Sequence, residues 1–234
     1  MTETTLSDND IELLKRYNKP GPRYTSYPTA PEWQNDFSHK DYVKQLAILD
    51  KKRDTDSLSL YFHVPFCEER CLYCGCHVII DKNRIYVDKY LDYLEKELAI
   101  FSQNMTGPCK VSQLHWGGGT PTYLNEAEIK RLYNSITRYF SIEEDAEVAI
   151  EIDPCVTSKS QIKVLRDLGF NRISMGVQDF NTSVQEAVHR VQSLELTTDL
   201  IDYARSIGFT SVNLDFIYGL PLQTVESFNE TIHK

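Results

Sequence analysis

The sequence predicts an α/β fold, in which parallel strands alternate with helices and the helices cover the outside of the sheet. Short apolar runs alternate along the chain with stretches whose apolar residues recur at helical spacing. In addition, residues 166–174 (RDLGFNRIS) are echoed by residues 205–213 (RSIGFTSVN). Each copy is a helix end, a glycine and an apolar strand, which is the pattern of a helix returning to a parallel strand. Successive right-handed βα units, closed or partly closed into a barrel, are therefore expected.

The first predicted unit begins with a buried strand over residues 58–64. The helix after it has apolar residues at helical spacing, namely Val87, Leu91, Leu94, Leu98 and Phe101. The second unit has a strand over residues 111–116 and a helix that Asn125 and Glu128 are expected to cap.

The third unit has a strand over residues 147–152. Its helix is expected to begin at Ser158, where Gln161 stands three residues further on as a capping partner. Gly169 is placed to end that helix. The echoed segments then supply the fourth and fifth strands.

Two parts of the chain lie outside this regular pattern. Residues 1–57 are polar, with a Pro- and Gly-rich stretch at 19–28, and are expected to form an irregular N-terminal arm. Residues 224–234 begin another helix, and a barrel that stopped there would leave one strand edge unpaired. The prediction is therefore a partial parallel βα barrel over residues 58–234, incomplete at its C-terminal edge, in a fragment of a longer protein.

Composition limits the possible functions. The 234 residues carry a net charge of -9, which argues against a nucleic-acid partner but not against an anionic small molecule held by local arginines. No stretch approaches the ~20 apolar residues of a membrane span, and the first residues do not resemble a secretory signal. A cytoplasmic protein without a membrane partner is expected.

Four of the six cysteines lie within residues 67–76 (CEERCLYCGC), directly after the first strand. In a cytosolic protein such a group more often binds metal than forms disulfides. A structural zinc site is one interpretation, although zinc usually takes ligand pairs from separated segments. An iron-sulfur cluster is the other, and a [4Fe-4S] cluster held by only three thiolates would keep one iron open. The single Cys109 and Cys155 are expected to be ordinary small apolar residues.

Glycines and polar side chains follow the other strands. The second strand ends in three glycines at 117–119, which would let a ligand approach the backbone. Polar residues end the later strands, namely Glu151, Asp153, Gln178, Asp179, Asn213 and Asp215. Because parallel βα folds bind ligands at the carboxyl ends of their strands, these side chains are expected to surround a cofactor.

The cysteine spacing resembles a known family. Cys67, Cys71 and Cys74 follow the pattern C-x₃-C-x₂-C, with an aromatic residue, Tyr73, before the third cysteine. This resembles the signature of the radical S-adenosylmethionine enzymes, whose fold is a partial βα barrel with this loop after its first strand. The resemblance implies a [4Fe-4S] cluster whose open iron binds S-adenosylmethionine. Reductive cleavage of that cofactor then gives a 5′-deoxyadenosyl radical.

Further segments resemble one branch of that family, the oxygen-independent coproporphyrinogen III oxidases. They are residues 17–29 and the motifs YFHVPFC at 61–67, GGGTPT at 117–122, EIDP at 151–154 and GVQDF at 176–180. The resemblance implies oxidative decarboxylation of two propionates of coproporphyrinogen III to vinyls, giving protoporphyrinogen IX in haem biosynthesis. It also implies two S-adenosylmethionine molecules and an electron donor that the sequence does not identify.

Site residues follow from the resemblance by motif. Cys67, Cys71 and Cys74 would hold the cluster, with Cys76 outside this triad. The implied contacts of the first S-adenosylmethionine are Tyr61, Gly118 and Glu151. The implied contacts of the second are Tyr73, Gly119, Thr120, Gln178, Arg190 and Asp215.

Three other residues are candidates for substrate binding and catalysis. Lys19 and Arg23 are cations that could hold substrate carboxylates, although a solvated surface loop would look the same. His63 is the catalytic candidate, either as a proton carrier or cofactor neighbour, or else as a hydrogen-bonded strand residue.

Three alternatives to the oxidase remain open. One is a haem chaperone-like radical S-adenosylmethionine protein without oxidase activity, against which the N-terminal arm and Cys76 argue. Another is an inactive fragment, because a sixth strand and a C-terminal region of the family are missing. The third is a zinc-stabilised structural module with no redox role.

Overall fold

The computed structural model describes residues 7–19, 29–34 and 36–234, which belong to two compact units divided between Tyr42 and Val43. The first unit contains α1 (Asp8–Tyr17) and the 3₁₀ helix η1 (Ala30–Glu32), and α2 (His39–Lys52) crosses the division. The expected arm is therefore not irregular throughout, and that part of the prediction was wrong. Its polar composition concealed the helix starts, since Ser7 caps α1 in a capping box with Asp10.

The second unit alternates strands with helices, as the sequence predicts. Its elements are β1 (Leu58–Val64), β2 (Phe66–Cys67), β3 (Ile79–Ile80), α3 (Val87–Ser102), β4 (Cys109–Gly118), η2 (Pro121–Tyr123), α4 (Glu126–Thr137), β5 (Phe140–Ile152), α5 (Lys159–Asp167), β6 (Arg172–Gln178), α6 (Thr182–Ala187), α7 (Leu194–Ser206), β7 (Ser211–Phe216) and α8 (Val225–His233).

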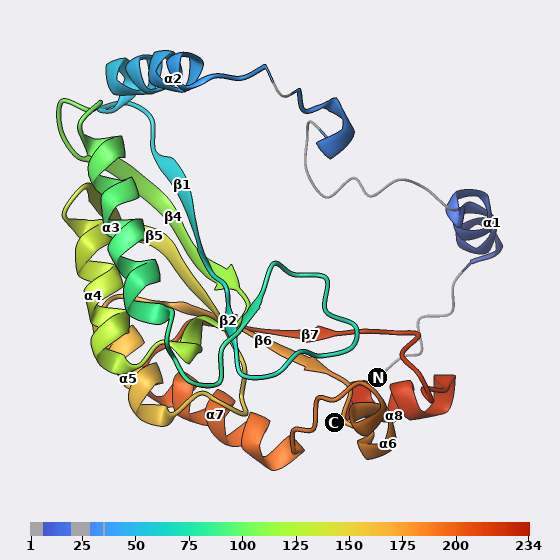
Figure 1. The fold of residues 1–234 in the computed structure, drawn as a ribbon. Coiled ribbons are helices and arrows are strands. Elements are labelled where there is room, and N and C mark those ends of the chain that lie inside the picture. The colour runs from blue at the N-terminus through green and yellow to red at the C-terminus, as the bar shows by residue number, and fades with distance from the viewer. Residues whose placement is uncertain (1–6, 20–28, 35) are drawn as a thin grey trace. The chain divides into compact units, whose positions relative to one another are not determined.

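Five strands of the described part form one parallel sheet in the order β1-β4-β5-β6-β7 (Figure 1). The strands thus follow one another in the sheet as they do in the chain, which is the outcome of successive βα units wound in one direction. The short strands β2 and β3 pair separately. The predicted α/β fold with a parallel sheet is confirmed. In the part of the chain that the structure describes, no helix is long and apolar enough to cross a membrane.

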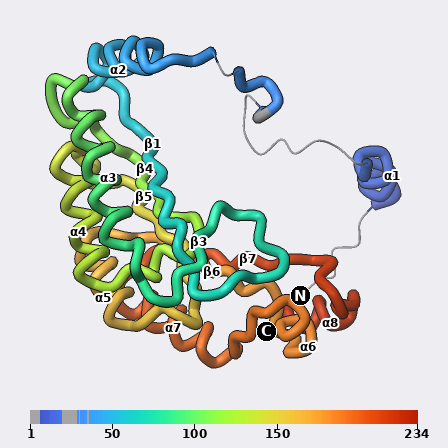
Figure 2. The backbone as a smooth tube through the Cα atoms, in the orientation of Figure 1, coloured from blue at the N-terminus to red at the C-terminus, as the bar shows by residue number. Residues whose placement is uncertain are grey.

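The helices α3, α4, α5 and α7 stand along one face of the sheet (Figures 1 and 2). The core lies between them and the strands, where Leu114, Trp116, Ile150 and Ile173 are at most 1% exposed. The Trp116 ring meets the Phe170 ring edge-on, with centroids 5.1 Å apart. Burial of this apolar surface supplies the main stabilisation of the unit.

The opposite face of the sheet is polar and accessible. In β1, Phe62 and Val64 are buried whereas Ser59 and Tyr61 are exposed, and β6 alternates in the same way along its length. The expectation of a fully buried first strand was therefore wrong for one of its two faces. Side chains alternate across a strand, so packing helices against only one face leaves every second residue accessible. The polar face can therefore receive a ligand.

The predicted helix boundaries near the site are confirmed. Asn125 and Glu128 form a capping box at the start of α4, and Ser158 and Gln161 form another at the start of α5. Gly169 follows α5 with a φ of +99°, a left-handed conformation that glycine adopts without strain.

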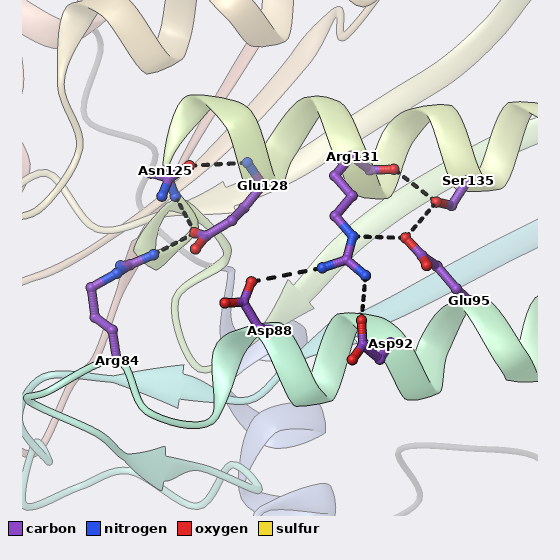
Figure 3. Close-up of polar contacts among 8 residues, drawn as sticks. All are labelled: Arg84, Asp88, Asp92, Glu95, Asn125, Glu128, Arg131 and Ser135. Carbon is purple, nitrogen blue, oxygen red and sulfur yellow. Dashed lines mark hydrogen bonds and ion pairs between the residues drawn. The ribbon is translucent and has the colours of Figure 1, made fainter.

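An arginine joins α4 to α3 on the surface of the helical layer (Figure 3). Arg131 donates to Glu95 at 2.8 Å and to Asp92 at 2.6 Å, and its third nitrogen lies 3.7 Å from Asp88. The hydrogen bonds to Glu95 and Asp92 raise the pKa of the Arg131 guanidinium. Because these carboxylates are largely exposed, solvent weakens each pair. The cluster orients the two helices more than it stabilises them.

Asp179, directly after β6, is expected to be important for stability. Its carboxylate is 1% exposed and accepts hydrogen bonds from Thr231 at 2.5 Å, Gln223 at 2.6 Å and the Asn181 amide at 2.7 Å. Asp179→Asn should lower the free energy of unfolding by about 1–3 kcal/mol, because a buried hydrogen-bonded group loses its matched partners. Chemical denaturation at pH 7 measures this change. Asp199→Asn, which alters an exposed ion pair with Lys159, is the matched control.

The effect of Asp179 should also depend on pH. Burial alone would raise the pKa of this carboxyl, but the hydrogen bonds from Thr231, Gln223 and Asn181 lower it below its usual 3.8. A carboxylate with a depressed pKa stabilises the folded state above the unfolded pKa, and this stabilisation is lost as pH falls through the folded pKa. The difference between wild type and Asp179→Asn should therefore shrink below about pH 4. An equal difference at pH 3 and pH 7 would contradict this account.

Candidate functional site

A cavity of about 430 Å³ is lined by the cysteine loop and by the carboxyl ends of β4 to β7. Its volume lies within the roughly 300–1,000 Å³ typical of ligand pockets. Most of the predicted site residues line it, namely Cys67, Cys71, Cys74, Tyr73, Gly118, Gly119, Thr120, Glu151, Gln178, Arg190 and Asp215. Segments up to 148 residues apart in sequence are thus brought to one place, since Cys67 and Asp215 both line it.

The other predicted residues have different positions. Tyr61 and His63 lie on β1, where Tyr61 pairs in register with His115 of β4. Lys19 is exposed and belongs to the first compact unit. Arg23 lies outside the described residues.

Backbone hydrogen bonds hold the cysteine loop in place. The amide of Asp81 donates to the carbonyl oxygen of Cys67 at 3.1 Å, and that of Ile79 donates to Pro65 at 2.7 Å. In the middle of the loop, the Leu72 amide donates to Val188 at 3.1 Å. The buried carboxylate of Asp81 in turn accepts two backbone amides of the following turn. The thiols are therefore presented by a loop that is fixed at both ends and at its centre.

The four thiols share one environment. Cys67, Cys71 and Cys74 are half-buried and Cys76 is exposed, and all four line the cavity. Burial raises the pKa of the Cys67 thiol, although the Thr120 hydroxyl at 3.5 Å opposes this shift. Among the described ranges, no three His, Cys, Asp or Glu side chains converge closely enough to hold a single metal ion. The thiols instead surround a shared space.

The glycines at the end of β4 allow that strand to pass close to the cysteine loop. A Cβ at Gly118, whose φ is +122°, would lie 2.7 Å from the carbonyl oxygen of Val64. A Cβ at Gly119 would lie 2.7 Å from the Phe66 oxygen and 2.9 Å from the Cys67 sulfur. These separations are below van der Waals contact, so larger residues would push the loop away. The run serves loop packing as well as the ligand access that the sequence indicates.

His63 has both ring nitrogens engaged. Its Nε2 lies 2.8 Å from the carbonyl oxygen of His77, which can only accept, so Nε2 carries a proton. In the neutral ring Nδ1 then accepts a hydrogen bond from the Tyr61 hydroxyl, at 3.0 Å. Neither nitrogen is free to take a proton from a ligand. This geometry supports the hydrogen-bonded strand role for His63 over the proton carrier.

Arg190 connects three elements at the cavity. Its guanidinium donates to Asp153 at 2.8 Å and to the Gly176 carbonyl at 2.8 Å, and it lies 3.7 Å from the Cys71 sulfur. Burial alone would lower the pKa of Arg190. The attraction of Asp153 and of other neighbouring groups outweighs burial, so the pKa is raised. Among the described residues its Nε is buried without a partner. A ligand with an oxygen or nitrogen acceptor would satisfy this donor.

Two sequence-based expectations for individual residues need correction. Cys155 is not an ordinary apolar residue, since it is exposed, lines the cavity and donates from its thiol to Val191 at 3.3 Å. Burial of the sulfur, followed by the charge of Asp153, raises the pKa of this thiol to about 11. The position of Cys155 just after the third predicted strand could have indicated that it lines the site. The second correction concerns Asp179, which was expected beside a cofactor but belongs to the buried network described above. Cys109 is buried, as predicted.

His115 was missed altogether at the site. Its Nε2 lies 3.1 Å from Oε1 of Glu151, one of the predicted cofactor contacts. The alternation of β4 could have revealed it, because His115 stands between the apolar residues Leu114 and Trp116 of the buried face.

Comparisons with known proteins show the family to which the chain belongs. A model of the Radical SAM superfamily matches residues 61–234. The oxygen-independent coproporphyrinogen III oxidase of Escherichia coli (strain K12) is 48% identical over 227 residues, which cover 97% of this chain and 49% of that protein. The corresponding protein of Synechocystis sp. is 45% identical over 223 residues, 95% of this chain and 47% of that protein. The chain thus spans about half the length of the curated relatives it matches.

Solved structures show the same relationship. The coproporphyrinogen III oxidase from Escherichia coli, described as a radical SAM enzyme, superposes with a TM-score of 0.85 at 46% identity, covering 95% of this chain and 49% of that one. A radical S-adenosylmethionine methyltransferase from Kitasatospora setae gives a TM-score of 0.52 at 15% identity over 80% of this chain and 35% of that one, which shows the shared fold alone. With the family match extending over residues 61–234, the chain belongs to the radical SAM superfamily.

Proposed function

We propose that the protein is a radical S-adenosylmethionine oxidoreductase that acts on coproporphyrinogen III. The reaction is the oxidative decarboxylation of two propionate side chains to vinyl groups, giving protoporphyrinogen IX in haem biosynthesis. The observation that carries the proposal is the cavity in which the three motif cysteines meet the polar ends of β5, β6 and β7. The 48% identity to an oxidase of this name supports it, although the chain covers only about half of that relative.

Membership of the family implies a [4Fe-4S] cluster and S-adenosylmethionine. We assign the cluster to Cys67, Cys71 and Cys74, and leave Cys76 outside the ligand set. The donors fit, because thiolates are the usual ligands of such clusters and these three thiols line one cavity. When bound, the cofactors supply a radical that can take a hydrogen atom from the β-carbon of a propionate.

Two cofactor molecules are assigned by motif. Tyr61, Gly118 and Glu151 would contact the one on the cluster. The second would contact Tyr73, Gly119, Thr120, Gln178, Arg190 and Asp215. The unpartnered Nε of Arg190 supports a ligand at this second position. The task of these residues would be to orient the cofactors and to exclude water from the reacting carbon.

The substrate and partner assignments are part of the same proposal. Lys19 and Arg23 would hold propionates of the porphyrinogen, and an electron donor of unidentified nature would reduce the cluster. The net charge of -9 argues against a nucleic-acid partner, and no membrane partner is proposed. Six free thiols are consistent with the reducing conditions of the cytoplasm. The proposed domain division is an N-terminal arm of residues 1–57 and a barrel core of residues 58–234.

The proposal is tested by anaerobic reconstitution of the protein with iron and sulfide. We expect about four irons per chain, together with cleavage of S-adenosylmethionine that is coupled to decarboxylation of added coproporphyrinogen III. Stoichiometric zinc without iron would overturn the proposal in favour of a structural zinc module. A cluster and cofactor cleavage without decarboxylation would instead favour the chaperone-like alternative or an incomplete catalytic unit.

A further inference from the structure

His115 lies on the open, polar face of the sheet, next to the candidate site. It belongs to β4, where its sequence neighbours Leu114 and Trp116 are 1% and 0% exposed within the core. Since side chains alternate across a strand, this packing forces His115 onto the opposite face. The strand register places it between Tyr61 of β1 and Ala149 of β5.

The imidazole of His115 fixes one oxygen of Glu151. The two atoms, Nε2 and Oε1, are 3.1 Å apart, and a carboxylate can only accept, so Nε2 carries the proton. The other oxygen of Glu151 accepts the Gly118 amide at 3.3 Å. A carboxylate has about four acceptor positions, so two remain for donors that enter the cavity. Glu151 lines that cavity and its side chain is 44% exposed.

The ring of His115 is itself held in place. It stacks on the Tyr61 ring, with centroids 5.8 Å apart and an angle of 13° between the planes. The hydroxyl of Tyr61 is in turn bonded to His63 at 3.0 Å. Glu151 itself belongs to β5, but the orientation of its carboxylate is therefore set through residues of β1 and β4.

We propose that His115 is a positioning residue, which turns the Glu151 carboxylate so that its free acceptor positions face the ammonium or hydroxyl groups of bound S-adenosylmethionine. The inference rests on the proposed function for one point, the contact between Glu151 and the cofactor. Without the imidazole, the Glu151 carboxylate would rotate about its side-chain torsions. Binding the ligand would then have to order this side chain, and the entropy cost would reduce the affinity. His115 acts through Glu151 and makes no contact with the reacting atoms in this account.

The test compares S-adenosylmethionine binding by the cluster-reconstituted protein and its variants, measured by equilibrium dialysis and by the change that the cofactor causes in the electron paramagnetic resonance of the reduced cluster. His115→Phe keeps a ring for stacking but removes the donor, and should weaken binding about tenfold, as expected for loss of a charge-assisted hydrogen bond. His115→Gln retains a donor at a similar reach and should remain within about threefold of wild type. His39→Phe, the same change at an exposed position of α2, should have no effect.

Different outcomes separate the inference from the proposed function. Weaker binding in Glu151→Gln with normal binding in His115→Phe would overturn the inference alone. Weaker binding in His115→Gln than in His115→Phe would also overturn it, because the stacked ring and not the donor would then matter. Normal binding in Glu151→Gln would remove the assigned contact between Glu151 and the cofactor, and with it the inference, whereas the proposed reaction would still be decided by the decarboxylation assay. Binding in wild type without any decarboxylation would overturn only the proposed reaction.

A second measurement does not depend on the variants of His115 being folded. In wild-type protein labelled with ¹⁵N-histidine, nuclear magnetic resonance should show His115 protonated at Nε2, as its bond to Glu151 requires. Glu151→Gln should shift that resonance. A proton at Nδ1 alone, or a resonance that Glu151→Gln leaves unchanged, would overturn the inference.

Discussion

Replacing Cys71 by alanine is expected to leave the anaerobically reconstituted protein without a [4Fe-4S] cluster. Cys71 lies near the centre of the cysteine loop, next to Leu72, whose amide donates to the carbonyl oxygen of Val188, and it lines the cavity. Iron and sulfide analysis, together with the brown colour of the cluster, measures the result. Loss of the cluster should be nearly complete, because the assignment gives the cluster only three cysteine ligands and Cys71 is one of them.

Cys76→Ala is the matched change within the same loop and should leave the cluster formed. Cys76 is exposed where the three assigned ligands are half-buried, although it lines the same cavity. Cys109→Ala, a change at a buried thiol of β4, controls for the loss of any cysteine. Loss of the cluster in both Cys71→Ala and Cys76→Ala would show four cysteine ligands, and the open iron of the proposed mechanism would disappear.

The parts of the fold that sequence predicts well are those with local causes. The capping boxes at Asn125 and Ser158 form because side chain and amide are three residues apart, and Gly169 ends its helix through its own φ. The cysteine loop is also local, so its spacing indicates its role before any tertiary structure is known. Short-range geometry can be inferred from residues that are close in sequence.

The missed features depend on contacts between distant segments. Asp179 looks like another polar strand end, but Thr231, 52 residues later, makes it part of a buried network. His115 becomes important only because Glu151, 36 residues away, stands on the next strand. The apolar run at residues 58–64 also suggested a buried strand, whereas helices cover only one face of the sheet here. Long-range hydrogen-bond partners, and the face of a sheet that helices cover, follow from the topology. Residue patterns predict that topology only in outline.

Removal of the Arg190 guanidinium should be the most destabilising single change at the site. Arg190 and Asp153 form an ion pair at 2.8 Å, with side chains 13% and 19% exposed. Arg190→Met leaves the Asp153 carboxylate poorly solvated and without its cation. We expect the free energy of unfolding to fall by about 2–4 kcal/mol, near the range for breaking a buried pair from one side. Chemical denaturation of the protein before reconstitution measures this fall without any contribution from the cofactors.

Two comparisons identify the cause of that destabilisation. Arg131→Met removes an arginine with three carboxylate neighbours that are 40–90% exposed, and should cost only about 1 kcal/mol because solvent screens such pairs. The double change Arg190→Met with Asp153→Asn should recover part of the loss, since no unpaired charge then remains. Equal losses in Arg190→Met and Arg131→Met would mean that burial does not strengthen the Asp153 pair. In that case Arg190 would serve the bound ligand more than the fold, and its removal would be felt mainly after reconstitution, as weaker cofactor binding.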